Sequence, residues 1–169
     1  MSARLRTSRV PRVLQIALAL AAASQACAAR DCFDEAAAYH GVSAAVLRAI
    51  AKVESNLRAD AVSRNRNGSQ DIGMMQINSI HLKELDRWGV GVAQLGDACV
   101  NIYVAAWHYR RQIDRWGNTW LAVGTYHSAT PVHRDAYVRR VRQVLAGWLR
   151  QGDLPRLAAL AGNVKSSGE

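Results

Sequence analysis

A carboxylate on an apolar helical stripe is the feature that most constrains the fold of this chain. Three aliphatic side chains and one acid recur at the spacing of a single helix face: Leu47, Ile50, Glu54 and Leu57. Moving an ionised carboxyl out of water is so costly that the group tends to stay protonated, and its pKa rises. We therefore predict a core helix that carries a general acid active near neutral pH. The alternative is a Glu at a frayed helix end that faces solvent or pairs with Arg58.

Residues 1–29 have the layout of a secretory signal peptide. A start with four arginines and no acid is followed by an apolar run over residues 13–23 and by the small-residue pattern Ala26-Cys27-Ala28. The apolar run is too short for a good membrane span. We therefore expect an exported protein with a mature domain over residues 30–150 and a flexible tail over residues 151–169.

The cysteines fit an oxidising compartment. If cleavage follows Cys27, an even pair remains, Cys32 and Cys99, which we expect to form a disulfide. Chain entropy would then contribute about 4 kcal/mol of stability. Two buried free thiols are the alternative for this pair. For Cys27 the alternative is lipid attachment, although the preceding Ser24-Gln25-Ala26 matches that motif poorly.

The charge of the chain narrows the class of partner. Loss of the leader removes four arginines and lowers the formal net charge from +9 to +5. A basic surface suits an anionic polymer such as nucleic acid, lipid headgroups or a cell wall with peptide carboxylates. Export argues against nucleic acid, and the sequence has neither a Gly-rich phosphate loop nor a zinc-knuckle spacing. We expect a periplasmic monomer with no metal and no cofactor, because the histidines lack the spacing of a zinc site.

The periodicity of the mature chain predicts a mainly α fold, with a polar loop or short hairpin beside the functional groove. Ser43, Asp97 and Thr119 are placed to cap helices, and Pro131 to end one. Asn and Gly mark residues 58–71 as a loop, with a short hairpin around residues 66–72. The expected helices cover residues 34–40, 43–54, 79–88, 97–116, 119–129 and 135–149.

Four segments in one order and spacing resemble the lysozyme-like lytic transglycosylases. They are Val53-Glu-Ser-Asn56, Asp71-Ile-Gly-Met-Met-Gln-Ile-Asn78, Cys99-Val-Asn-Ile-Tyr103 and Ala122-Val-Gly-Thr-Tyr-His-Ser-Ala129. The likeness is greatest to the small exported members that accompany type III secretion and conjugation systems, and it extends from Cys32 to about Trp148. It implies a lysozyme-like helical domain, peptidoglycan glycan strands as substrate, and components of such an apparatus as partners.

The resemblance also implies roles for single residues. Glu54 matches the catalytic acid, Ser55 a hydroxyl that helps to hold substrate, and Tyr126 a tyrosine whose hydroxyl lies close to the acid. His127 stands where much of the family has Asn, which marks the subgroup and places His127 with the substrate-binding residues. The segment that lines the saccharide groove matches Gly73, Met74, Met75 and Gln76.

Without the family, these residues have simpler interpretations. Met74 and Met75 are more often core filler than groove wall. A buried Gln76 amide needs partners, either substrate or backbone. Tyr126 alone reads as a core tyrosine with a satisfied hydroxyl.

The expected chemistry follows from the number of carboxylates. Glycosidic cleavage needs a proton for the leaving oxygen and stabilisation of an oxocarbenium-like centre, and hydrolases add a second carboxylate within about 5–10 Å. Asp60 and Asp71 are the acids near Glu54 in sequence, and neither has an obvious inward position. A mechanism with a single carboxylate fits a transglycosylase that forms a 1,6-anhydro sugar. Together with the resemblance, this implies a lytic transglycosylase that cuts the β-1,4 bond between N-acetylmuramic acid and N-acetylglucosamine and opens the wall locally for an apparatus. The alternatives are a goose-type-like muramidase that uses Asp60 or Asp71, and a non-catalytic wall-binding assembly protein.

Overall fold

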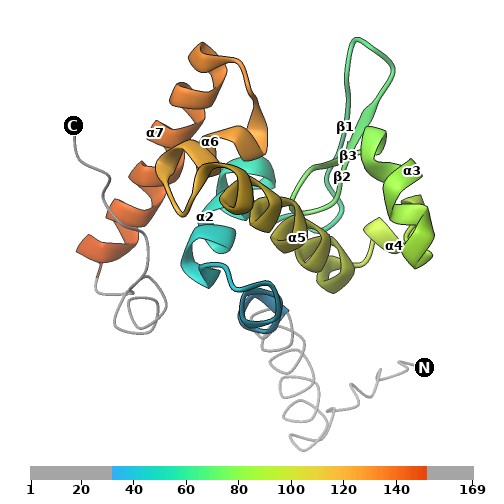
Figure 1. Ribbon diagram of the computed structural model, residues 1–169, viewed down its shortest axis with the longest axis horizontal. Helices are drawn as coiled ribbons and strands as arrows, with labels where there is room; N and C mark the ends of the chain where they lie inside the picture. Colours follow the sequence, from blue (N-terminus) through green and yellow to red (C-terminus); the bar gives the residue numbers. More distant parts are fainter. Residues whose placement is uncertain (1–31, 152–169) are drawn as a thin grey trace, which may run out of the picture.

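The computed structural model describes residues 32–151 (Figure 1). The expected signal peptide, Cys27 and all but the first residue of the expected tail lie outside this range. A helical stretch covers residues 32–40. The longer helices that follow are α2 (Ala44–Ser55), α5 (Ala98–Trp116), α6 (Trp120–His127) and α7 (Pro131–Arg150). Shorter elements are the helices α3 (Leu82–Leu85) and α4 (Val92–Leu95), the 3₁₀ turns η1 (Ser79–His81) and η2 (Asp86–Trp88), and the strands β1 (Val62–Arg64), β2 (Gln70–Ile72) and β3 (Ile77–Asn78).

The three predicted caps begin the helices as expected. The Ser43 hydroxyl accepts from the amide of Val46 at 3.4 Å at the start of α2. Asp97 and Thr119 accept in the same way, three residues ahead, at the starts of α5 and α6. Each side chain satisfies an amide that has no partner within the helix, so these boundaries are set locally.

Two helix predictions were wrong in their boundaries. Pro131 does not end a helix but opens α7, four residues before the predicted start, and α6 has already ended at His127 where Ser128 becomes extended. Proline suits the first helical position because no amide is needed there. The predicted helix at residues 79–88 is divided into η1, α3 and η2 and stops at Gly89, whose φ is 68°.

The hairpin prediction is confirmed and extended. β1 pairs antiparallel with β2, with Val62 opposite Ile72, and the turn closes where the amide of Asn65 donates to the carbonyl of Ser69 at 2.8 Å. β2 also pairs with β3. The third strand was not predicted because two residues carry no readable alternation.

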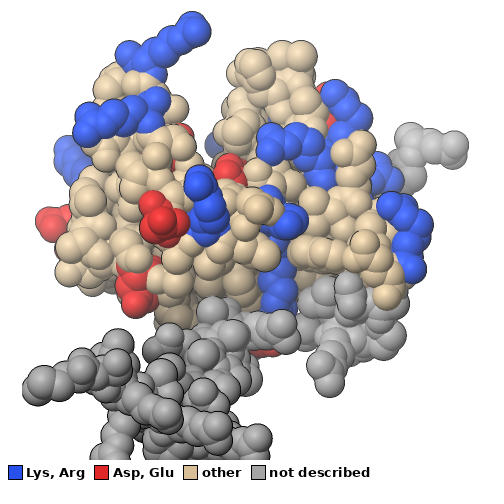
Figure 2. Space-filling model, turned by 180° about the vertical axis from the view of Figure 1, so that it is seen from behind, with Lys and Arg blue, Asp and Glu red and all other residues tan. Residues whose placement is uncertain are grey.

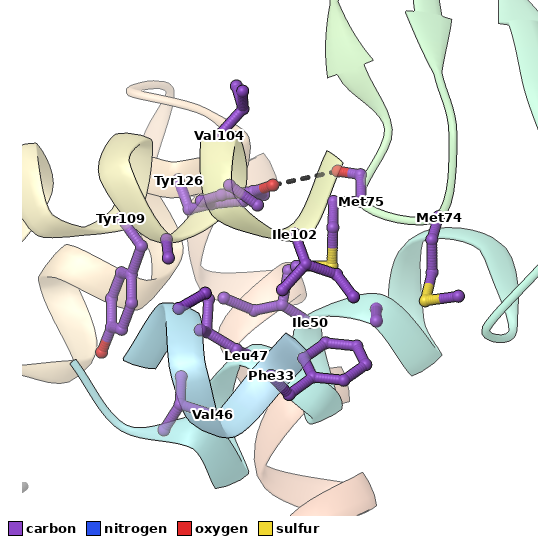
Figure 3. Packing of buried hydrophobic residues seen from close by; sticks show 14 of the residues in the cluster. Phe33, Val46, Leu47, Ile50, Met74, Met75, Ile102, Val104, Tyr109 and Tyr126 are labelled. Carbon is purple, nitrogen blue, oxygen red and sulfur yellow. Dashed lines mark hydrogen bonds between the residues drawn. The ribbon is translucent and has the colours of Figure 1, made fainter. Parts of the chain in front are cut away.

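The three-stranded sheet, α3 and α4 lie on one side of the domain and α2, α6 and α7 on the other, with α5 running across the middle (Figure 1). α2 packs on α7, and α6 packs on both α5 and α7. The core between them is built from side chains such as Leu47, Ile50, Met75 and Ile102 (Figure 3). The mainly α prediction is therefore confirmed. No helix within residues 32–151 is long and apolar enough to cross a membrane.

The predicted disulfide is present between Cys32 and Cys99, whose Cα atoms are 5.4 Å apart. It joins the helical stretch at residues 32–40 to the first turn of α5, which is 67 residues away in sequence. The bond therefore fixes the start of the described chain against the central helix.

Candidate active site

Glu54 lies in the last turn of α2, where the helix stops. Asn56 and Leu57 both adopt left-handed backbone conformations, with φ of 58° and 65°, and the amide of Asn56 donates to the carbonyl of Lys52. Asparagine tolerates this conformation better than most residues, so the helix ends here. The side chain of Glu54 is 14% exposed and lines a cavity.

The ionisable side chain that lies next to Glu54 is a histidine from α6, not the nearby Arg58. His127 Nδ1 lies 3.8 Å from Glu54 Oε1. At this distance a protonated imidazole forms an ion pair with the carboxylate. The His127 ring stacks on Tyr137 of α7, with centroids 4.6 Å apart and planes 2° from parallel. Arg58 instead donates from Nε to the carbonyl of Ser55. Three helices, α2, α6 and α7, therefore meet at this carboxyl.

Tyr137 completes this group, although sequence reasoning missed it. Its side chain is fully buried, and burial, followed by the charge of Glu54, raises the pKa of Tyr137 well above its usual range. Its hydroxyl makes no hydrogen bond of good geometry within residues 32–151. The Tyr137 hydroxyl therefore stays protonated beside the Glu54 carboxyl.

Tyr126, the tyrosine expected beside the acid, binds a backbone carbonyl. Its hydroxyl donates to the carbonyl oxygen of Met75 at 2.9 Å (Figure 3). Burial, and after it the charges of Glu54 and Asp71, raises the pKa of Tyr126 well above its usual range. Tyr126 therefore stays protonated and joins α6 to the turn that carries Met75.

That turn, residues 73–76, is held by side chains from α2 and α5. Ser55 Oγ donates to the carbonyl of Met74 at 2.7 Å. The buried Asn101 accepts from the amide of Met75 at 2.7 Å and donates to the carbonyl of Ile72 at 2.9 Å. Gly73 has a φ of +76°, and a Cβ there would lie 2.4 Å from Asn101 Nδ2. The position therefore requires glycine.

Gln76, the last residue of the turn, has partners for both ends of its amide. Its Nε2 donates to the carbonyls of Ala61 and Gly73, and its Oε1 accepts from Ser63 Oγ. Its backbone is left-handed, with a φ of 50°. Gln76 therefore binds the turn to β1 while it also lines the cavity.

The cavity has a volume of about 540 Å³ and lies between the hairpin and the helices α5 and α6. The surface is hollowed between these two halves of the domain (Figure 2). The structure brings Glu54, Gln76, Tyr126 and His127 to its wall. Of the other predicted site residues, Ser55, Gly73, Met74 and Met75 do not line it, and the two methionine side chains are buried in the core. The further lining residues are Asn65, Arg66, Asn67, Ser69, Asp71, Ile77, Asn78, Ile80, His81, Val104, Trp107 and His108.

A second carboxylate, Asp71, lines the same cavity. Its Oδ2 accepts from the side-chain amide of Asn65 at 2.9 Å, and its Oδ1 accepts from that of Asn78 at 2.6 Å. These bonds fix the carboxylate on the sheet side of the cavity. Asp60 is exposed and does not line the cavity.

Two histidines on the cavity wall have lowered pKa values, which favour the neutral imidazole. Burial is the largest factor that lowers the pKa of His108, to about 4, and burial also lowers the pKa of His81. Their rings are 4.9 Å apart, and His108 Nε2 lies 3.4 Å from the carbonyl of Tyr126. Between residues 32 and 151 no cluster of three or more histidine, cysteine or acidic side chains is arranged to hold a metal.

One signal in the sequence points to two of the missed residues. Asn101 and His108 share the helical spacing of Val104, so each is a polar side chain on the inward face of α5. This is the pattern that singled out Glu54 in α2. No comparable signal identifies Tyr137, because a tyrosine on an apolar stripe is ordinary core.

Comparison with known proteins identifies the family. Residues 31–142 match the model of the transglycosylase SLT domain. The chain is 36% identical to the invasion protein IagB of Salmonella typhimurium over 111 residues, which cover 65% of this chain and 69% of that protein. It is 37% identical to the X polypeptide of Escherichia coli over 139 residues, 78% of this chain and 82% of the relative. It is also 33% identical to protein IpgF of Shigella flexneri over 122 residues, which cover 71% of this chain and 80% of that protein.

The matched region contains the helical core, the disulfide and every residue that lines the cavity around Glu54. This chain therefore belongs to the transglycosylase SLT-domain family.

Proposed function

We propose that the protein is a peptidoglycan lytic transglycosylase in which Glu54 is the catalytic acid and base. The observation that carries this proposal is the largely buried Glu54 carboxyl on the cavity wall, beside His127 and Tyr137. A proton donor shielded from water and open to a groove is what cleavage of a glycosidic bond requires.

The reaction has two steps. Glu54 gives its proton to the oxygen that leaves with N-acetylglucosamine, and the bond from that oxygen to the muramyl anomeric carbon breaks. The N-acetyl carbonyl of the muramyl residue stabilises the positive carbon. The ionised Glu54 then takes the proton of the muramyl 6-hydroxyl as its oxygen bonds to the anomeric carbon. The product is the 1,6-anhydro sugar, no water is consumed, and Glu54 is protonated again.

The character of the cavity wall supports a cell-wall glycan as substrate. Asparagine, serine and glutamine side chains of the hairpin region line one side, which suits a sugar rich in hydroxyl and amide groups. Among the residues between 32 and 151 that line the cavity, Arg66 is the one lysine or arginine. It forms no ion pair within the described part of the chain. Its charge favours the carboxylates of wall peptides over an uncharged glycan.

A periplasmic location and a role beside a secretion or conjugation apparatus are part of the proposal. They are supported by the signal-peptide pattern of residues 1–29, by the disulfide, and by similarity to a relative named as an invasion protein. A monomer would be sufficient for this role, because the described chain alone supplies the cavity and Glu54.

Asp71 supports a second candidate function, a goose-type-like muramidase. Its carboxylate lines the same cavity and is held by two amides, as a group that positions a water molecule would be. In that case the product carries a reducing end instead of the anhydro bond. A non-catalytic wall-binding protein is the third candidate, and it predicts no product at all.

Mass spectrometry of purified peptidoglycan digested with the protein tests all three. We expect anhydromuramyl products from the wild type and none from Glu54→Gln. The matched control is Glu35→Gln, an exposed acid in the helical stretch at residues 32–40, which should digest normally. Reducing ends would favour the muramidase, and Glu54→Gln activity within about tenfold of wild type would rule out Glu54 as the acid.

A further inference from the structure

Two tryptophans continue the cavity wall beyond the group around Glu54. Trp107 of α5 lines the cavity. Its ring meets the ring of Trp88, from η2, edge to face with centroids 5.4 Å apart. Trp88 does not line the cavity and is 55% exposed. The two indoles, which we call the indole shelf, therefore form a continuous aromatic surface from the cavity to the outside.

Each indole of the shelf has an arginine over its ring. The guanidinium of Arg111 lies 4.7 Å from the ring centre of Trp107, and that of Arg87 lies 4.9 Å from the ring centre of Trp88. Contacts of this kind are attractive because the face of an indole is electron-rich. An arginine on one face also restricts the orientations that the ring can adopt.

One carboxylate holds both arginines. Arg111 Nη1 lies 2.7 Å from Glu84 Oε2, and Arg87 Nη2 lies 3.1 Å from Glu84 Oε1. Arg87 Nε also donates to the backbone carbonyl of Glu84 at 2.9 Å. The hydrogen bond from Arg111 is the largest factor that lowers the pKa of Glu84, so the Glu84 carboxyl is ionised at neutral pH, when both arginines are charged.

The arrangement differs from that of other exposed apolar side chains in this domain. Trp116 is also exposed, at 40%, and also carries a stacked arginine, Arg115, but it does not line the cavity, and no carboxylate within residues 32–151 forms an ion pair with that arginine. The shelf is thus ordered before anything binds, which reduces the entropy lost on binding.

We propose that the indole shelf is a stacking subsite for the glycan strand, beyond the cleavage centre, and that Glu84 is its positioning residue. The pyranose ring of an N-acetylated sugar has an apolar face of C–H groups, which packs on an electron-rich indole face. The ligand of the shelf is a peptidoglycan strand, because the shelf is continuous with the cavity in which we propose that the strand is cleaved. The inference rests on the proposed function.

Binding without turnover tests the shelf. The full chain carrying Glu54→Gln is sedimented with insoluble purified peptidoglycan over a range of protein concentrations. We expect Trp88→Ala in this background to bind about fivefold more weakly, as expected for loss of one aromatic contact. Trp88→Phe keeps a ring and should restore binding to within twofold. Trp116→Ala is the matched control and should bind like its parent.

Glu84→Gln tests the positioning role, because it removes the negative charge that pairs with both arginines and leaves both indoles in place. We expect weaker binding in the Glu54→Gln background. In the enzyme with Glu54 intact, Glu84→Gln should lower kcat/KM for peptidoglycan mainly through KM, with an unchanged unfolding midpoint. A merely structural role would instead lower the unfolding midpoint and leave the KM unaffected.

Failure of this inference is distinct from failure of the proposed function. Suppose that the wild type releases muramyl products. If Trp88→Ala then binds peptidoglycan within twofold of its parent, or if Trp116→Ala loses as much affinity as Trp88→Ala, the shelf is not a subsite, and the enzyme assignment stands. If the wild type and Glu54→Gln both fail to bind peptidoglycan, the inference and the proposed function are both wrong.

Discussion

The hydroxyl of Ser55 donates to the carbonyl oxygen of Met74 at 2.7 Å and so joins the residue after Glu54 to the turn at residues 73–76. Ser55 is buried, and its oxygen also accepts from the amide of Arg58. The same turn receives the Tyr126 hydroxyl through Met75. The end of α2, the turn and α6 are thereby held as one unit around the cavity.

Ser55→Ala should lower the free energy of unfolding by about 1–3 kcal/mol, because the buried carbonyl of Met74 loses its donor and the amide of Arg58 loses its closer acceptor. Denaturant unfolding measures this loss. Ser63→Ala also removes a hydrogen bond, from the exposed Ser63 hydroxyl to Gln76, and should cost less, about 0.5–1 kcal/mol. Weaker peptidoglycan binding by Ser55→Ala with normal stability would contradict the structural role and favour direct contact with substrate.

Gly73→Ala should be far more damaging than Gly68→Ala. Both glycines have positive φ, 76° and 84°, but a Cβ at Gly68 meets nothing within 4 Å, whereas one at Gly73 overlaps the side chain of Asn101. We expect a loss of about 1 kcal/mol at Gly68, from the backbone conformation alone. At Gly73 we expect about 3 kcal/mol or more, because the overlap adds to it. Equal losses in denaturant unfolding would mean that Asn101 moves aside freely.

Tyr137→Phe should reduce turnover without reducing stability. The substitution keeps the ring under His127 and removes only a buried hydroxyl without a good hydrogen bond. If that O–H donates to Glu54 during the reaction, kcat falls about tenfold. Tyr109→Phe is the matched control, because the hydroxyl of Tyr109 is also buried and unpartnered, but Arg110, not Glu54, is its charged neighbour. Equal kcat values for the two variants would remove Tyr137 from the mechanism.

Stability should fall as the pH is lowered from about 7 to 5, because of His108. Its pKa is about 4 in the folded chain and 6.5 ordinarily. Below pH 6.5 the unfolded chain therefore takes up a proton that the folded chain does not, and the folded state loses about 2 kcal/mol by pH 5. Urea unfolding at several pH values measures the slope. His108→Gln should flatten it, and the same flattening in the exposed variant His133→Gln would contradict the assignment.

Cys99→Ser should lower the melting temperature without changing the products of digestion. Loss of the Cys32–Cys99 bond releases a loop of 67 residues, which costs about 4 kcal/mol on the chain-entropy model. A fall on the order of 10 °C follows for a domain of this size. Reductant should lower the melting temperature of the wild type to that of Cys99→Ser, and Cys27→Ser should have the melting temperature of the wild type. No shift in Cys99→Ser would mean that the disulfide contributes nothing to stability.

Local sequence patterns determined most of the helical fold. Ser43, Asp97 and Thr119 cap their helices with their own side chains, so no distant contact is needed to place those boundaries. Pro131 shows the limit of this reasoning. A proline marks either end of a helix, and α7 extends from it because residues further on, such as Tyr137, bury one face against α2 and α6.

The sequence alone also singled out Glu54 as the residue to place at the centre of the candidate site, because an acid on an apolar stripe is an anomaly that needs no structure to detect. Only the tertiary structure decided what surrounds it. His127 and Tyr137 reach Glu54 from helices more than 70 residues further along the chain. Ser55 turns to the backbone of Met74, and Asp71 turns into the cavity. Helical and strand periods specify which face a side chain occupies, but what that face meets depends on long-range packing of α2, α5, α6 and α7.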